Sequence, residues 1–430
     1  MREPIYKFEH EFLALEEDGL SRSHFQLLEK YLEKQKKSYL FETSYRKNKI
    51  GIKFNSYVGV ITVKDLTIYV LPKADKEAKE GTDDKKLWQN RLIFMLSQVY
   101  KLNVQTTAPS NLQWRPNVLL NIFLKKFLDE VALLLNRGLI KTYRKTDGNR
   151  TALKGKLLFN KQIAFNCVHQ ERFYVRYTTY DYNHILNRII RQALLAIHNI
   201  TNSSDIKGRA ASTLFNFPEL DEIAVTPELF SRLIFDRKSE DYRTVIKLAE
   251  MILLNYSPDL HHGSNHVWTL MFDMNKLWEE FIFVTLRRKL IGCTVSAQKQ
   301  KILWESDNNR KTVRADIVVE KGSDVFVLDT KWKMPRYDGK IVPSDADLHQ
   351  MYVYLDVYKN EGIKAKKEAL LYPGKEKDVY GHFKEDNASC DMIFLPGENY
   401  TPPSTNKTEC REWQDAMANR IKTWMKLDNT

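Results

Sequence analysis

The stretch Val313–Lys333, VRADIVVEKGSDVFVLDTKWK, decides the fold. Apolar and polar residues alternate on both sides of Gly322-Ser323, which is the period-two pattern of β-strands. Gly-Ser is a dipeptide that closes a two-residue hairpin, because glycine supplies the positive φ of a type II′ turn. The sequence therefore predicts an antiparallel hairpin that turns at Gly322 and Ser323.

The register of this hairpin places Asp316 directly opposite Asp329, on one face. Directly opposed residues have Cβ atoms about 4.5–5.5 Å apart, where two carboxylates repel unless a cation lies between them. A strand does not keep an unpartnered buried carboxylate for packing, because its burial costs several kcal/mol. Lys331, two residues beyond Asp329, points to the same side. The pattern predicts a divalent-metal site.

The expected metal is Mg²⁺, or Mn²⁺, because such an ion binds a few carboxylates and keeps several waters. Asp316 and Asp329 are the predicted ligands, and the backbone carbonyl of Thr330 is a third candidate. The ion would activate water and neutralise charge in phosphodiester hydrolysis. Lys331 would orient that water and stabilise the developing charge. The structural alternative is an ordinary Asp–Lys network on a solvated face.

Composition points to a nucleic-acid partner. The 430 residues are 43% hydrophobic and 28% charged, which is typical of a globular protein with two or three domains. The net charge of +12 favours a polyanion, most commonly nucleic acid. The N-terminus lacks a signal-peptide pattern, no apolar run approaches a membrane span, and four cysteines without CxxC spacing suit a reducing compartment. We expect a cytoplasmic protein without a membrane segment.

We expect three parts along the chain. Residues 1–110 form a β-rich module with strands between Phe41 and Pro72, followed by a charged loop from Lys73 to Lys86. Residues 111–265 are mostly helical, with strand-like sequence from 138 to 175. Residues 266–430 begin with a helix at 270–290 that leads into the hairpin. A basic, aromatic loop at 335–344 follows, and Ser344 with Asp347 forms the N-terminal cap of the next helix.

The spacing D-x(12)-D-T-K, made by Asp316, Asp329 and Lys331, resembles the PD-(D/E)XK nuclease superfamily, with Ala315 in place of the usual proline. Four further stretches resemble the McrC family, the nuclease subunit of modification-dependent restriction systems. They are GVITVKDLTIYVLPK (59–73), GLIKTYRKTDGNRTALKGKL (138–157), D-x-N-x-x-x-N at Asp181, Asn183 and Asn187, and FDMNKLWEEF (272–281). The likeness extends from about residue 50 to 360.

The resemblance implies an α/β (α+β) fold in which a C-terminal nuclease core of mixed sheet and flanking helices follows a β-rich module and a mostly helical region. It implies a metal-dependent DNA endonuclease subunit of a 5-methylcytosine-dependent restriction system. The implied partners are DNA and a hexameric McrB-like AAA+ GTPase. The N-terminal module would dock that GTPase and stimulate it.

The resemblance also assigns residues around the hairpin. Glu279 matches the family glutamate, whereas Glu280, about 100° further around the helix, points elsewhere. We expect Glu279 to be an outer ligand of the metal or its water. Gln350 is expected to hydrogen-bond Lys331 or a DNA phosphate, although a solvent-facing glutamine would look the same. Three cations interleaved with Trp332 and Tyr337 are candidate contacts to the DNA backbone, unless their loop is only solvated: Lys333, Arg336 and Lys340.

Two other functions fit parts of the sequence. A non-catalytic adaptor could bind DNA and regulate the GTPase, with the acid pair as a relic. A stand-alone nuclease could act on RNA or branched DNA without a partner. Metal binding that depends on Asp316 would count against the adaptor, and cleavage without a partner would favour the stand-alone enzyme.

Overall fold

The computed structural model describes residues 4–16, 19–35, 39–46, 48–73, 82–102, 118–201, 203–257, 267–306, 309–360, 365–374, 376–384, 388–396 and 407–426. The expected domain boundaries at 110 and 265 lie outside these residues. The chain forms two compact units. The first combines Met1–Leu119 with Met271–Thr430, and the second is Leu120–Leu270.

The N-terminal part of the first unit is rich in strands. β1 (Ile5–Phe8) pairs in parallel with β6 (Leu66–Leu71), which forms a hairpin with β5 (Tyr57–Val63). The turn of this hairpin lies at Lys64-Asp65, as the sequence predicts, and Lys64 has a φ of 53°. A second sheet has the order β2-β4-β3, from Phe12–Ala14, Lys49–Phe54 and Phe41–Arg46. Two helices accompany these sheets, α1 (Arg22–Gln35) and α2 (Thr82–Val99).

Two boundaries differ from the sequence prediction. Helix α2 already begins at Thr82, so the expected loop does not extend to Lys86. The segment before α9 is strand β11 (Val267–Asp273), and α9 spans Met274–Lys289 rather than beginning at Leu270. Most of VWTLMFD is buried, and periodicity alone does not separate a buried strand from a buried helix. The Asp273 side chain caps α9 by accepting from the Asn275 N–H at 3.0 Å.

The C-terminal part of the first unit is built on a mixed sheet with the order β12-β13-β14-β17-β18. The predicted hairpin is β13–β14, in which Lys321 pairs with Asp324 and Gly322 has a φ of 61°. Strands β12 to β14 are antiparallel, and β14, β17 and β18 are parallel. The bounds are Thr294–Glu305, Arg310–Lys321, Asp324–Thr330, Ala365–Pro373 and Cys390–Leu395.

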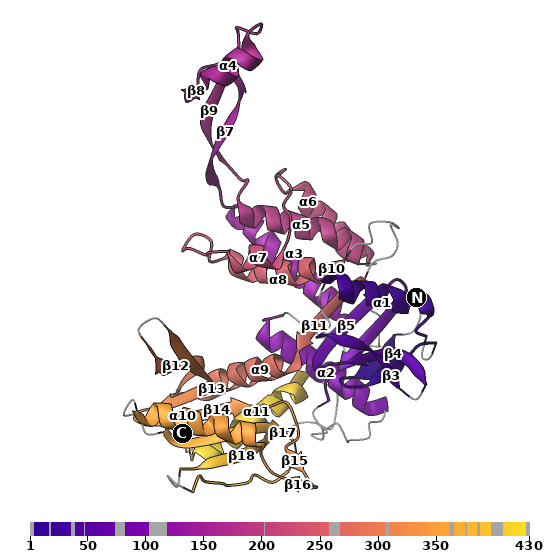
Figure 1. Ribbon diagram of the computed structural model, residues 1–430, viewed down its shortest axis with the longest axis vertical. Helices are drawn as coiled ribbons and strands as arrows, with labels where there is room; N and C mark the ends of the chain where they lie inside the picture. Colours follow the sequence, from indigo (N-terminus) through magenta and orange to yellow (C-terminus); the bar gives the residue numbers. More distant parts are fainter. Residues whose placement is uncertain are drawn as a thin grey trace. The chain divides into compact units, whose positions relative to one another are not determined.

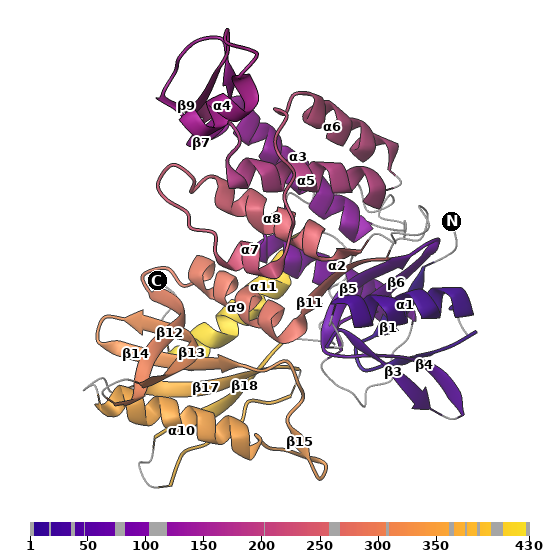
Figure 2. The same ribbon diagram turned by 45° about the horizontal axis from the view of Figure 1, so that its top comes forward.

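Helices cover both faces of this sheet (Figure 2). α10 (Asp345–Asn360) covers one face, where Tyr354 and Tyr358 pack in a cluster with Val327. α9 and α11 (Lys407–Met425) cover the other face, where Phe326 of β14 contacts Trp424 of α11. Strand β14 is therefore buried from both sides. The α/β fold expected from the sequence is confirmed.

The second unit is a helical body that carries a long β-ribbon. α3 (Val118–Arg137), α5 (Ile185–Ile200), α6 (Ser204–Phe215), α7 (Pro227–Ser231) and α8 (Tyr242–Leu254) are its helices, and β10 (Tyr256–Ser257) pairs with β11. The ribbon pairs β7 (Thr142–Arg150) with β9 (Phe173–Asp181) and extends away from α5 (Figure 1). β8 (Lys156–Leu157) and α4 (Phe159–Asn166) lie at its far end. The sequence indicated only strands in this region, so α4 corrects that prediction.

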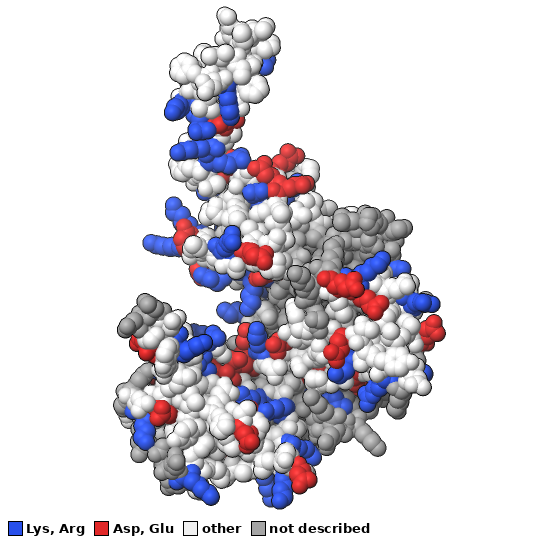
Figure 3. Space-filling view, in the orientation of Figure 1, with Lys and Arg blue, Asp and Glu red and all other residues white. Residues whose placement is uncertain are grey.

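The ribbon has a basic shaft and an apolar end. Lys and Arg side chains gather along the shaft in Figure 3. Arg144 and Lys145 of β7 and Arg176 of β9 are exposed. Phe159, Ile163 and Phe165 of the terminal helix are all exposed. None of the helices in the described part of the chain is both long and apolar enough to cross a membrane.

Candidate functional site

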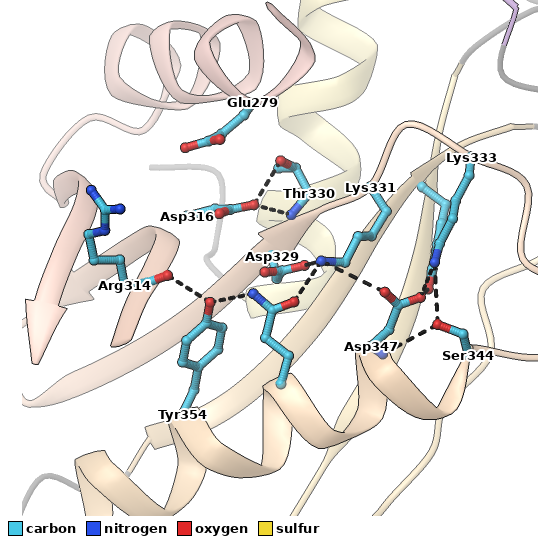
Figure 4. A network of polar contacts seen from close by, with 12 residues as sticks. Glu279, Arg314, Asp316, Asp329, Thr330, Lys331, Lys333, Ser344, Asp347 and Tyr354 are labelled. Carbon is cyan, nitrogen blue, oxygen red and sulfur yellow. Dashed lines mark hydrogen bonds and ion pairs between the residues drawn. The ribbon is translucent and has the colours of Figure 1, made fainter. Parts of the chain in front are cut away.

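The acid pair lies where the β13–β14 hairpin leaves its ladder. The paired positions run from Lys321 and Asp324 to Ile317 and Leu328. One further step places Asp316 beside Asp329, which is the register predicted from the turn. The Asp329 side chain is fully buried, with an exposed fraction of 0%, and Asp316 is half-buried. In Figure 4, Asp316 lies between Glu279 and Asp329.

Asp316 is anchored to the neighbouring strand by Thr330. The Thr330 N–H donates to Asp316 Oδ2 at 2.8 Å, and the Thr330 hydroxyl donates to the same oxygen at 3.0 Å. Burial raises the pKa of Asp316 above its ordinary value, although these two hydrogen bonds and the charge of Lys331 act in the opposite direction. Thr330 therefore fixes one carboxylate through its N–H and side chain. The metal contact expected from its carbonyl stays a prediction.

Asp329 has a cation on one side and an unpartnered oxygen on the other. Lys331 Nζ lies 2.6 Å from Asp329 Oδ2, and no donor among the described residues hydrogen-bonds Oδ1. Burial, followed by the charge of Asp316, raises the pKa of Asp329 to about 7. Burial alone would lower the pKa of Lys331, but Asp329 raises it above its ordinary value. The lysine is therefore held as an ammonium ion beside the acid pair.

Helix α10 supplies a polar relay that holds this lysine. Lys331 Nζ donates to Gln350 Oε1 at 2.8 Å, so the expected contact between these residues is present. Gln350 Nε2 donates to the Tyr354 hydroxyl at 2.7 Å, and that hydroxyl donates to the Arg314 carbonyl at 2.6 Å. Gln350 is thus oriented from both ends, with β13 as the fixed point (Figure 4).

Asp347 belongs to the same network, although the sequence indicated only a helix cap. Its side chain is buried and lies 2.6 Å from Lys333 Nζ and 3.8 Å from Lys331 Nζ. Tyr372 donates to it at 3.2 Å. Burial would raise the pKa of Asp347, but Lys333 and Ser344 lower it below its ordinary value. The signal in the sequence was its place three residues after Ser344, which caps the helix by accepting from the Asp347 N–H.

Helix α9 presents Glu279 to the acid pair. Glu279 is half-buried and Glu280 is exposed, in agreement with the choice made from the sequence. The Glu279 carboxylate accepts a hydrogen bond from Gln298 Nε2 of β12. Burial, followed by the charge of Asp316, raises the pKa of Glu279 to about 7. Gln298 did not stand out in the sequence.

The segment that carries the candidate DNA contacts is not the loop that the sequence suggested. The segment is a small hairpin, β15 (Arg336–Tyr337) with β16 (Lys340–Ile341). Trp332 is buried and donates to Glu9 Oε1 at 2.7 Å, so it is not available to DNA. Lys333 is bound to Asp347, and Arg336 lies 3.3 Å from Glu376. Tyr337 and Lys340 are exposed.

The donor set at the hairpin fits a hard divalent cation. Asp329 Oδ1 is a buried carboxylate oxygen that has no hydrogen-bond donor in the described part of the chain, and Asp316 provides a second carboxylate beside it. Two carboxylates with waters are a common protein contribution to a Mg²⁺ site. Among the described residues, no three His, Cys, Asp or Glu side chains are close enough to hold a metal together. The cation would therefore depend on the two aspartates, with Glu279 in an outer position.

A groove of about 510 Å³ opens beside the acid pair. Its lining includes Asp316 and Gln350, together with Gln298, Arg314 and His349. Such a volume lies within the range of small-molecule sites in proteins. The Asp316 carboxylate is therefore reachable from solvent on this side of the sheet.

Comparisons with known proteins agree with the fold. The chain is 23% identical over 307 residues to the Type IV methyl-directed restriction enzyme EcoKMcrBC of Escherichia coli (strain K12), which covers 68% of this chain and 88% of the relative. A chain in the assembly of Thermococcus gammatolerans McrB AAA+ hexamers with bound McrC matches with a TM-score of 0.59 and 21% identity, over 97% of this chain and 99% of that one. The family model described as McrBC 5-methylcytosine restriction system component matches residues 52–373. The protein belongs to this family of McrBC restriction system components.

Proposed function

We propose that this protein is the metal-dependent DNA endonuclease subunit of a 5-methylcytosine-dependent restriction system. One observation carries the proposal: the fully buried Asp329 keeps an oxygen that no described residue hydrogen-bonds, directly beside Asp316 and Lys331. A purely structural Asp–Lys pair would need no second carboxylate, and it would not leave a buried oxygen unpaired, because such burial costs free energy. A metal-dependent phosphodiesterase site uses both features, the second carboxylate and the oxygen that is free to bind a cation.

Asp316 and Asp329 would hold a Mg²⁺ or Mn²⁺ ion, with the Thr330 carbonyl as a further ligand. The bound ion would supply activated water and neutralise charge on the scissile phosphate. The residues of the chain have separate tasks around it. Lys331, held as a cation by Asp329 and Gln350, would stabilise charge on the phosphate and orient the water. Glu279 would accept a hydrogen bond from that water.

DNA is the proposed substrate, and an McrB-like AAA+ GTPase hexamer is the proposed partner. The net charge of +12 supports a polyanionic ligand. The Thermococcus gammatolerans assembly contains McrB AAA+ hexamers with bound McrC. The family resemblance implies that the N-terminal module docks this GTPase. The exposed apolar residues at the end of the β7–β9 ribbon, which include Phe159 and Ile163, support a second docking surface there.

The proposal is tested with methylated and unmethylated plasmid DNA, Mg²⁺, the cognate GTPase and GTP. Wild-type protein should linearise methylated plasmid only with the partner, and Asp329→Asn should abolish cleavage while GTPase stimulation persists. Asp356→Asn, an exposed change on α10, is the matched control and should remain active. Cleavage without the partner would instead favour the stand-alone nuclease. Stimulated GTPase without any cleavage would favour the adaptor.

A further inference from the structure

Gln298 of β12 has an unusual backbone conformation at the position across the sheet from Asp316. Its φ is +52°, in the left-handed region that residues with a side chain rarely adopt. It lies in the interior of β12, where Ala297 pairs with Ile317 and Lys299 pairs with Ala315. The position across the ladder from Gln298 is therefore Asp316. The flanking pairs keep one register, so the left-handed residue interrupts the ladder at this position without shifting it.

The side chain of Gln298 connects this strand to helix α9. Its Nε2 donates to Glu279 Oε1, and the same side chain lines the groove with Asp316. Strand β12 contains neither glycine nor asparagine, the residues that adopt a left-handed conformation most readily. Strained residues that the surrounding structure maintains cluster at active sites. Here one strained residue faces one member of the acid pair and binds the glutamate beside it.

We propose that Gln298 is a positioning residue that holds the Glu279 carboxylate toward Asp316, and that the left-handed backbone at 298 serves to aim its amide. The inference rests on the nuclease function proposed above. Gln298 acts through Glu279 and has no direct role in the chemistry. A local change of φ re-aims the side chain while the neighbouring pairs of β12 and β13 stay in place. The cost of the conformation is then explained by function rather than by folding.

Three substitutions separate the backbone from the amide. Gln298→Gly relieves the strain and removes the amide, so thermal stability should stay the same or rise while kcat falls. Gln298→Asn tolerates the left-handed region and keeps an amide, but it is one methylene shorter and should not reach Glu279. Gln298→Ala removes the amide alone. Each variant should lower kcat for partner-dependent cleavage about tenfold, with KM nearly unchanged.

Gln300→Ala is the matched control. Gln300 lies two residues further along β12, and its Nε2 donates to Thr312 Oγ1 at 2.8 Å rather than to the candidate site. This variant should cleave DNA at the wild-type rate. A merely structural role for Gln298 predicts instead that Gln298→Ala lowers the thermal stability without a selective loss of kcat, while Gln300→Ala again behaves as wild type.

A double-mutant cycle decides whether Gln298 acts through Glu279. In a Glu279→Ala background, Gln298→Ala should cause no further loss of kcat, because the positioned group is already gone. Additive losses, or wild-type kcat in Gln298→Ala, would overturn the inference while leaving the nuclease function intact. Asp329→Asn is measured beside these variants. If wild-type cleavage did not depend on Asp329, the proposed function and the inference would both be overturned.

Discussion

Lys331, the residue directly after β14, and Gln350 of α10 are joined by a hydrogen bond of 2.8 Å between Nζ and Oε1. The contact links the central strand of the sheet to the helix that covers it. Gln350 is itself held by the Tyr354 hydroxyl, which is anchored to the backbone of Arg314. The position of the lysine therefore depends on a relay that begins on the strand carrying Asp316.

Breaking this relay should slow cleavage without removing the metal. Gln350→Leu removes the amide oxygen that orients Lys331 but leaves its contact with Asp329, and we expect partner-dependent cleavage to fall about tenfold. Tyr354→Phe removes the link behind Gln350 and should cause a smaller loss. Mn²⁺ affinity, measured calorimetrically, should stay at the wild-type value in both variants. Wild-type cleavage rates in Gln350→Leu would show that the contact has no functional role.

Glu368 should make the stability of the protein depend on pH. The side chain is buried on β17, and neither carboxylate oxygen has a hydrogen-bond partner among the described residues. Burial raises its pKa from 4.5 to about 8. Because the folded protein holds the proton more tightly, this stabilising contribution is complete below about pH 4.5 and is lost as pH rises through about 8.

Glu368→Gln keeps the shape of the side chain and stays neutral at every pH. Its Tm should match that of wild type near pH 5 and exceed it by about 5 °C near pH 8.5. Differential scanning calorimetry at both pH values measures the effect. Glu305→Gln, at an exposed position on β12, serves as the control. An equal effect of Glu368→Gln at both pH values would refute the buried, neutral state of Glu368.

Asn187 should be a structural residue rather than a catalytic one. It is fully buried, and its Nδ2 donates to the carbonyls of Ile140 and Tyr182, each at 2.8 Å. Its Oδ1 accepts from the Tyr242 hydroxyl at 3.0 Å. The motif at Asp181, Asn183 and Asn187 thus ties the end of the β-ribbon to helices α5 and α8.

Asn187→Ala leaves two carbonyls and a hydroxyl without this partner, so it should lower the free energy of unfolding by about 3 kcal/mol. Asn183→Ala, at a less buried position of the same motif, should cost less than about 1 kcal/mol. Urea denaturation compares the two variants. Divalent-metal binding should be normal in both. Normal stability in Asn187→Ala together with lost activity would contradict the structural role.

The sequence predicted the acid pair correctly because its information is local. The Gly322-Ser323 turn and the alternation of the two strands together define the register, so Asp316 and Asp329 could be paired without a structure. The bond from Gln350 to Lys331 was anticipated from family resemblance. Both features could be predicted from the spacing of residues within short elements or from a known family pattern.

Other features depend on tertiary packing and left weaker signs. Trp332 looked available to DNA, but it is buried against Trp278 and bound to Glu9, more than three hundred residues earlier. Asp347 was predicted only as part of a helix cap, because Ser344 three residues earlier accounts for an acidic residue at this position. The left-handed conformation of Gln298 has no signature in the sequence, because glutamine does not favour this region of backbone conformation as glycine and asparagine do. Such contacts become visible only when distant segments are brought together.

The claim that the acid pair holds a divalent ion is tested most directly by Mn²⁺ binding to the full chain, measured by isothermal titration calorimetry. Wild-type protein and Asp356→Asn should bind one ion at this site with equal affinity. Asp316→Asn and Asp329→Asn should each bind at least about tenfold more weakly, because each removes a ligand charge. Unchanged affinity in both aspartate variants would contradict the account.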